Sequence, residues 1–205
     1  MLYRRDDRRH WSDVYGARAV DEVSWYQAVP AVSLELIAEA GLTNESAIID
    51  VGGGASSLAG NLLRSGYRDL TVLDVSAGAL AAARDHLGER AGEVRWIEAD
   101  LLQWRPDRAY DLWHDRAVFH FLTGRAERER YLATLRATLA SAVVVGTFAA
   151  DGPDHCSGLP TSRYDPGHLA AEFPGYELLS SRREEHHTPA GLLQPFTWAL
   201  LRRVG

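Results

Sequence analysis

Hydrophobic residues along this chain fall into short apolar runs separated by longer segments with helical spacing. Runs of strand length occupy residues 47–51, 70–73, 94–98, 110–114 and 142–148. Residues 31–40, 57–65, 76–87 and 125–139 carry apolar side chains three and four positions apart, which predicts helices. Strands that alternate with helices are typical of a parallel sheet covered on both faces. We therefore expect an α/β fold with right-handed crossovers.

The two ends of the chain differ from this alternating centre. Residues 176–187 and 192–203 predict a closing β-hairpin, in which Pro195 indicates a bulge or an exposed edge. A short helix is expected at 167–173. Residues 149–166 form a Gly- and Pro-rich connection, and the length of the loop at 152–165 within it is typical of a functional lid. Near the start, Trp11 and Tyr15 have helical spacing and predict an amphipathic helix over 4–18.

Composition indicates one folded domain. The chain has 205 residues, of which 46% are hydrophobic and 24% charged. We expect residues 1–41 to form a helical cap or lid, and 46–205 to form the core. The net charge of −6 disfavours a nucleic-acid partner, because such proteins need a basic face. A single cysteine excludes an intrachain disulfide and a multi-cysteine metal cluster, so no metal is expected.

Features that the sequence lacks also limit where the protein is expected to act and which chemistry it can use. The first residues lack the apolar stretch of a secretory signal, and the longest apolar run, 142–150, is too short to span a bilayer. A cytoplasmic monomer or weak homo-oligomer is the resulting expectation. All 22 basic residues are arginine, which excludes Schiff-base catalysis by lysine.

The stretch Ile48–Leu58 predicts a ligand-binding turn. A buried strand runs into three consecutive glycines, Gly52, Gly53 and Gly54, and then into a helix. Glycines let the backbone approach a ligand closely, and the helix directs its positive end at that ligand. The next strand ends at Asp74, 22 residues after Gly52, where nucleotide-binding folds place the acid that binds ribose hydroxyls.

The residues around this turn favour a cationic cofactor over a dinucleotide. The dinucleotide pattern requires a glycine where this chain has Ser57, and no arginine follows Asp74 to bind a 2′-phosphate. The carboxylate of Asp50 at the strand end disfavours a pyrophosphate and favours a cation. S-adenosylmethionine carries an ammonium and a sulfonium and no phosphate.

The segment Asp50–Ser56 resembles motif I of the class I S-adenosylmethionine-dependent methyltransferases, with Ser56 in the last glycine position. The resemblance covers about residues 48–203. It implies a Rossmann-like, seven-stranded, mostly parallel sheet with helices on both faces and a C-terminal antiparallel hairpin. Where many relatives carry Pro-Gly-Gly before the fifth strand, this chain has residues 140–142, Ala-Ser-Ala.

The resemblance also implies roles for the acids at the predicted strand ends. Gly52 and Gly54 would approach the methionine part of the cofactor, with Asp50 near its ammonium, and Asp74 would bind the ribose. The remaining contacts concern adenine and sulfonium: Val75 on the adenine face, Asp100 and the Leu101 amide on its edge, and His114 and Asp115 beside the sulfonium. A single acid would be interpreted as a helix cap, but Asp50, Asp74, Asp100 and Asp115 together favour a cofactor site.

Candidate residues for the methyl acceptor follow the fourth strand and flank the core. His120 is the first candidate for a general base and His114 the second; alternatively, His120 is a buried core histidine. Arg116 either binds a substrate carboxylate or pairs with Asp115. In relatives the N-terminal region folds over cofactor and acceptor, which implies contacts from Trp11, Tyr15, Trp25 and Tyr26; the alternative is a helix face packed on the core. Further candidates are Phe119, Cys156, Arg163 and Tyr164, where Cys156 could equally be a small buried residue and Arg163 a surface ion-pair partner.

The leading hypothesis is methyl transfer to a small-molecule acceptor by in-line displacement, with S-adenosylhomocysteine as product. The alternative is a protein lysine methyltransferase, because some relatives also carry an Asp-Arg/Lys pair like Asp115-Arg116. An NAD(P)-dependent oxidoreductase and a non-catalytic S-adenosylmethionine-binding protein are weaker alternatives. The sequence leaves open whether O, N, S or a metalloid receives the methyl group.

Overall fold

Seven strands form one sheet in the computed structural model, which describes residues 10–11 and 23–204. The strand order is β3-β2-β1-β4-β5-β9-β8. The first five strands are parallel and β9 and β8 are antiparallel, which confirms the predicted sheet. The strands are β1 (Ala47–Val51), β2 (Asp69–Asp74), β3 (Val94–Glu98), β4 (Leu112–Arg116), β5 (Ala142–Phe148), β8 (Tyr176–His187) and β9 (Leu193–Arg203).

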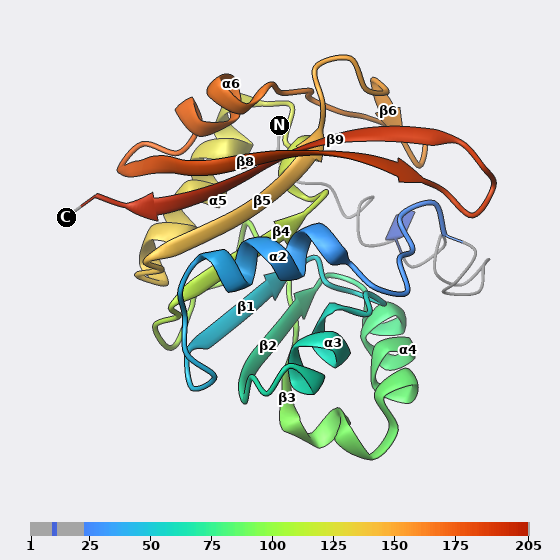
Figure 1. Ribbon diagram of the computed structural model, residues 1–205, viewed down its shortest axis with the longest axis vertical. Helices are drawn as coiled ribbons and strands as arrows, with labels where there is room; N and C mark the ends of the chain where they lie inside the picture. The colour runs from blue at the N-terminus through green and yellow to red at the C-terminus, as the bar shows by residue number, and fades with distance from the viewer. Residues whose placement is uncertain (1–9, 12–22, 205) are drawn as a thin grey trace.

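Helices cover both faces of this sheet (Figure 1). Helices α2 (Ala31–Glu39), α3 (Leu58–Arg64) and α4 (Ala77–Leu87) contribute to one buried apolar cluster, which includes Leu36, Leu62 and Leu80. Helices α5 (Arg125–Ala137) and α6 (Pro166–Ala171) contribute to the other, which includes Tyr131 and Leu169. Alternate side chains of each strand enter opposite clusters, so Ile48 and Ile49 pack on different faces.

Local signals set most helix ends. The Ser76 side chain accepts a hydrogen bond from the Ala79 amide at the start of α4, as a serine N-cap does. The Asp165 side chain caps α6 in the same way. The described residues also form two short 3-10 helices, the η2 helix (Gly88–Glu93), which has no buried residue, and η3 (Phe119–Phe121), which contributes Phe119 and His120 to the core.

The fourth strand lies two residues further along the chain than the predicted 110–114. Its pairing with β5 continues through Asp115 and Arg116. Asp115 is therefore inside the strand, and its side chain points to one face of the sheet instead of out of the strand end. Ala117 follows with a φ of 70°, and this left-handed residue turns the chain sharply into η3.

The C-terminal part contains two differences from the predicted pattern. The connection 149–166 holds a small hairpin of β6 (His155–Cys156) and β7 (Leu159–Pro160). The irregularity of the long hairpin lies between Leu178 and Ser180, and pairing is continuous at Pro195. Pro195 is tolerated because β9 has run past its last pair with β5, Phe148–Phe196. In Figure 1, β8 and β9 extend beyond the end of β5.

Among the described helices, none has the length and apolar character needed to cross a membrane.

Candidate active site

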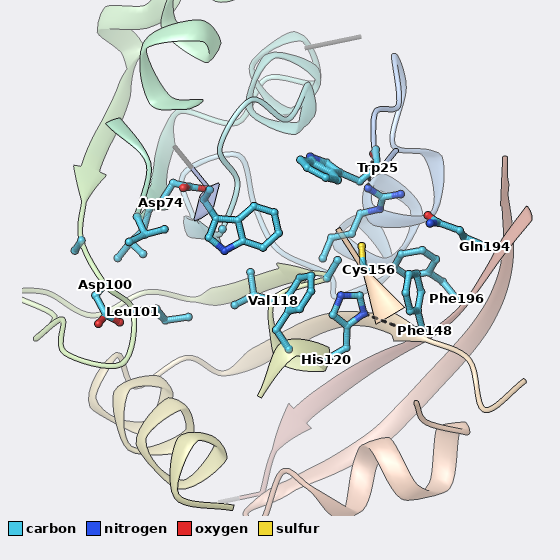
Figure 2. A pocket seen from close by; sticks show the side chains of 18 residues that line it. Trp25, Asp74, Asp100, Leu101, Val118, His120, Phe148, Cys156, Gln194 and Phe196 are labelled. Atoms are coloured by element: carbon cyan, nitrogen blue, oxygen red, sulfur yellow. Dashed lines mark hydrogen bonds between the residues drawn. The ribbon is translucent and has the colours of Figure 1, made fainter. Parts of the chain in front are cut away.

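A cavity opens at the carboxyl ends of the parallel strands, where open α/β sheets bind their ligands. It holds about 840 Å³ of empty space, including the part open to solvent. Figure 2 shows Asp74, Asp100 and Leu101 at one end, and His120, Phe148, Cys156, Gln194 and Phe196 at the other. The remaining lining residues are Trp11, Trp25, Gly52, Leu73, Val75, Ala99, Arg116, Ala117, Val118 and Phe121.

The glycine turn forms one wall of this cavity through Gly52. Gly52 has a φ of +66°, and a Cβ on it would lie 2.1 Å from Val118 Cγ2. A Cβ on Gly53 would lie 2.4 Å from the Asp50 carboxylate. Gly54 also has a positive φ, of 36°. These glycines are therefore required by the turn itself, and only Gly52 among them lines the cavity.

Asp74 is the acid at the end of β2 that lines the cavity. Its side chain accepts a hydrogen bond of 2.8 Å from the Ser76 amide. Burial, with a smaller contribution from the like charge of Asp50, raises the pKa of Asp74 to about 7. Backbone N–H groups of Ser76, Gly54 and Val75 oppose this rise. An ionised carboxylate has several acceptor sites, so it can also accept hydrogen bonds from a ligand.

The next acid, Asp100, lies beside two apolar lining residues, Val75 and Leu101. Its two carboxylate oxygens accept hydrogen bonds from the Leu102 amide, at 2.9 Å, and from the Gln103 side chain. These bonds hold the carboxylate in place at the edge of the apolar walls. The predicted adenosine contacts Asp74, Val75, Asp100 and Leu101 are thus brought together in one place.

Asp50 and His114 lie beneath the turn and outside this cavity. The Asp50 carboxylate is 2.7 Å from His114 Nδ1, and His114 Nε2 is 2.9 Å from the Ser33 hydroxyl. Both ring nitrogens are occupied and the side chain of His114 is 2% exposed. The prediction that His114 serves as a base beside the sulfonium is therefore not supported by its position, and Asp50 is not free to bind an ammonium directly.

Asp115 and Phe119 belong to the core on the other face. Asp115 is fully buried and accepts hydrogen bonds from the Val118 and Phe119 amides and, at 2.6 Å, from the Tyr131 hydroxyl. Phe119 packs between Tyr131 and Phe173. Neither residue lines the cavity, so the expected catalytic role of Asp115 and acceptor contact of Phe119 are not supported. Burial raises the pKa of Asp115 to about 6.

His120 lines the cavity, and its ring accepts a hydrogen bond from the backbone. The Phe148 amide donates to His120 Nδ1 at 3.3 Å, which leaves the ring proton on Nε2. Burial, reinforced by the charge of Arg116, lowers the pKa of His120 to about 3. Its predicted role as a general base is corrected: Nδ1 faces the backbone, and Nε2 carries a proton.

Arg116 does not pair with Asp115, whose side chain points to the opposite face. Its Nη1 donates to the Trp25 carbonyl at 2.7 Å, and the guanidinium lies 5.1 Å from the centre of the Phe196 ring. Burial lowers its pKa, opposed by the charges of Glu184 and Asp50. This buried guanidinium lies within the cavity lining, beside the aromatic end.

The other predicted residues divide between three places. Trp11, Trp25 and Cys156 line the cavity, where burial raises the pKa of the Cys156 thiol. Tyr26, Ser56 and His114 line a smaller cavity of about 360 Å³, which shares Trp25 and Arg116 with the first. Arg163 donates to the Gly152 carbonyl and Tyr164 packs on Phe119, both away from the cavity lining. Tyr15 lies outside the described residues.

Several lining residues were missed in the sequence. Phe121 and Phe148 follow directly from predicted elements, and their aromatic character was the available signal. Gln194 and Phe196 come from the C-terminal hairpin, which no local pattern connects with the glycine turn. They reach the cavity because β9 pairs with β5 and extends past its end.

Comparisons with known proteins agree with this architecture. Residues 48–142, from β1 to the start of β5, match a family model described as a methyltransferase domain. No protein of curated function matches the sequence.

Three solved structures illustrate the likeness in fold. An S-adenosylmethionine-dependent methyltransferase from Anabaena variabilis is 17% identical, with a TM-score of 0.75 over 99% of this chain and 96% of its own. A structure from work on the conversion of a disulfide bond into a thioacetal group during echinomycin biosynthesis is 20% identical, with a TM-score of 0.75. The match covers 96% of this chain and 92% of its own. The third is Burkholderia thailandensis 1,6-didemethyltoxoflavin-N1-methyltransferase, bound to 1,6-didemethyltoxoflavin and S-adenosylhomocysteine. It is 19% identical, with a TM-score of 0.69, and the match covers 98% of this chain and 85% of its own.

At these identities the solved structures show the fold, and the family model adds a sequence match over residues 48–142. The strand order, with an antiparallel β9 inserted between β5 and β8, distinguishes this fold from dinucleotide-binding sheets, whose classical order ends 4-5-6. The chain therefore has the fold of S-adenosylmethionine-dependent methyltransferases, and its residues 48–142 match a methyltransferase domain.

Proposed function

We propose that this enzyme methylates a small-molecule acceptor in the cavity that Asp74 and His120 share. The observation that carries the proposal is the continuity of this cavity. Two acids, Asp74 and Asp100, lie at one end, and aromatic side chains close the other (Figure 2). Cofactor and acceptor would therefore meet in one largely apolar space.

The residues at the acid end fit the cofactor. The buried Asp74 carboxylate would accept the ribose hydroxyls, and Val75 and Leu101 would enclose the adenine, with Asp100 at its edge. Gly52 would bring the backbone next to the methionine part. The small cavity lined by Ser56 and Tyr26 adjoins this one at Trp25 and Arg116, and we assign it no part of the adenosine.

Methyl transfer needs alignment and a dry site more than a proton relay. When bound, S-adenosylmethionine would supply a methyl group on a positively charged sulfur. The acceptor would attack the methyl carbon in line as the carbon–sulfur bond breaks, with S-adenosylhomocysteine as the leaving group. The chain's part is to fix the acceptor's position, which can account for about 7–11 kcal/mol of a barrier. Aromatic walls from Trp25, Phe148 and Phe196 exclude water. With His120 neutral and protonated at Nε2, we propose no general base.

The enclosed shape favours a small acceptor over a protein lysine. Trp11 and Trp25, from the N-terminal segment, and Cys156, from β6, border the cavity. We therefore propose that residues 1–41 serve as a cap over the 46–205 core, all within one methyltransferase domain.

Calorimetric titration with S-adenosylmethionine, S-adenosylhomocysteine and NADH tests the cofactor part. We expect micromolar binding of both adenosyl compounds and none of NADH. Asp74→Ala should weaken S-adenosylhomocysteine binding at least tenfold, because charge-assisted hydrogen bonds are lost. Asp69→Ala is the matched control, since Asp69 is a carboxylate at the opposite end of the same strand.

A labelled methyl donor then separates the acceptor classes. With a bacterial extract divided by size, label should appear in the fraction of small molecules. Label confined to protein lysines would replace this proposal with the protein-methyltransferase alternative, and unchanged affinity in Asp74→Ala would remove Asp74 from the cofactor site.

A further inference from the structure

Three buried N–H groups of the cavity lining have no hydrogen-bond partner among the residues that the structure describes. They are Arg116 Nε, Arg116 Nη2 and His120 Nε2. A buried donor without an acceptor costs about 1–3 kcal/mol, so such groups are normally satisfied by protein, water or ligand. All three are donors, and they belong to neighbouring side chains, since the Arg116 charge contributes to the lowered pKa of His120.

The guanidinium of Arg116 is held in one orientation, with its Nε and Nη2 N–H groups not hydrogen-bonded. Its Nη1 is fixed by the Trp25 carbonyl at 2.7 Å, and its plane is supported by the Phe196 ring. The free groups, Nε–H and Nη2–H, form the side of the guanidinium on which two parallel hydrogen bonds meet the two oxygens of a carboxylate. This edge is oriented before any ligand arrives.

Among the residues that the structure describes, the charges of Glu184 and Asp50 act on this cation, but neither carboxylate is bonded to it. No carboxylate there forms an ion pair with Arg116. Glu184 is occupied by the side chains of Gln27 and Trp198, and Asp50 by His114. The Cys156 thiol has a raised pKa and stays neutral. A buried cation without a counterion is costly, which favours binding of an anion.

The surroundings of the three donors are aromatic. Phe148 and Phe196 pack against each other and against His120, and Trp25 and Phe121 border the same space. A ligand here would present a flat apolar body to these rings and its oxygens to Arg116 and His120.

We propose that the methyl acceptor is a small, apolar, planar molecule that carries a carboxylate, bound by the Nε/Nη2 edge of Arg116 with a further hydrogen bond from His120 Nε2. The inference rests on the proposed function, because it takes the aromatic end of the cavity as the acceptor site. The cofactor's own carboxylate is the other source of the same chemistry. We place the acceptor there because His120 lies at the end of the cavity away from Asp74 (Figure 2).

The test uses 4-fluorobenzoate and its neutral counterpart 4-fluorobenzamide as probes. Both are titrated by ¹⁹F NMR into the protein saturated with S-adenosylhomocysteine. We expect the wild type to bind the benzoate at least about tenfold more tightly, since its bonds to Arg116 are charge-assisted. Equal affinities, or no binding of either probe, overturn the proposal without any variant. Absence of S-adenosylhomocysteine binding would instead contradict the proposed function.

Variants then show which side chains cause the preference for the benzoate. Arg116→Met should abolish it, Arg116→Lys should retain part of it, and His120→Phe should reduce it. Arg183→Met is the matched control, because Arg183 is an exposed arginine of β8 paired with Asp151. If a folded Arg116→Met protein still prefers the benzoate as strongly as the wild type, the assignment of Arg116 to the carboxylate is overturned.

A second pair of ligands distinguishes the two carboxylates. 5′-Methylthioadenosine lacks the amino-acid part of S-adenosylhomocysteine. We expect Arg116→Met to leave the affinities for both nucleosides within about twofold of wild type. Loss of affinity at least tenfold for S-adenosylhomocysteine alone would assign Arg116 to the cofactor's carboxylate and overturn the acceptor role.

Discussion

His114 lies directly opposite Asp50 on the neighbouring strand, and its Nδ1 is 2.7 Å from the Asp50 carboxylate. Since an ionised carboxylate can only accept, Nδ1 donates, and a neutral ring then accepts from the Ser33 hydroxyl at Nε2. This series of hydrogen bonds joins β1, β4 and α2 beneath the glycine turn. The Asp50 carboxylate is therefore held in place by the protein itself, without a ligand.

Removing His114 should therefore destabilise the protein. His114→Leu leaves the buried Asp50 carboxylate and the Ser33 hydroxyl without this partner, at a cost of about 1–3 kcal/mol in the free energy of unfolding. Urea denaturation measures it. In a double-mutant cycle with Asp50→Leu, the two costs should be non-additive, because the second change no longer strands a charge. Additive costs would show that the pair is not coupled.

Binding of S-adenosylhomocysteine should depend on the ionisation of Asp74. Its pKa is raised to about 7 by burial, and the ionised form is the one that accepts ribose hydroxyls. Affinity should therefore fall as the pH drops below 7, by about tenfold between pH 8 and pH 6, in proportion to the ionised fraction. Calorimetry at several pH values measures this dependence. It should disappear in Asp74→Asn and persist in Asp69→Asn; a flat wild-type profile would contradict the assignment.

The glycine turn should not accept a side chain at Gly53. The Cβ of Gly53→Ala would lie 2.4 Å from Asp50 Oδ2 and 2.9 Å from Val72 Cγ1, so the turn must move. We expect a loss of stability of about 1–3 kcal/mol from overpacking, together with weaker S-adenosylhomocysteine binding. Gly78→Ala in α4 is the control, since its Cβ meets only Ser76 Oγ at 3.8 Å. It should stabilise the protein by up to about 1 kcal/mol, and similar effects at both positions would argue against this packing.

Tyr131 should affect stability in a pH-dependent way and leave the cofactor site unchanged. Tyr131→Phe removes the donor to Asp115, whose pKa is raised to about 6 by burial. Above pH 6 the carboxylate is ionised and loses this donor, whereas at pH 5 it is mostly protonated and depends on it less. The cost should be about 1–3 kcal/mol at pH 8 and smaller at pH 5. Thermal or urea unfolding at the two pH values measures this cost. The affinity for S-adenosylhomocysteine should stay unchanged. A large loss of affinity would indicate that Asp115 contributes to the cofactor site.

Local pattern determined the elements and one end of the cavity. Strands β1, β3, β5 and β8 occupy the predicted ranges, because each is a short apolar or alternating run bounded by turn residues. The glycine turn and Asp74 were identifiable for a similar reason. Their roles depend on a strand end, a tight turn and a helix start within one short segment of chain.

Only the tertiary structure decided what His114, Asp115 and His120 do. Because β4 continues through Arg116, His114 and Asp115 point to opposite faces, toward Ser33 and Tyr131, and not out of the strand end. Side chains inside a strand point to the two faces of the sheet, so the two added residues at the end of β4 place Asp115 in the core instead of in the loop after the strand. The proton on His120 depends on the backbone of Phe148, 28 residues away. Sequence spacing does not encode such contacts, since they arise when the whole sheet assembles.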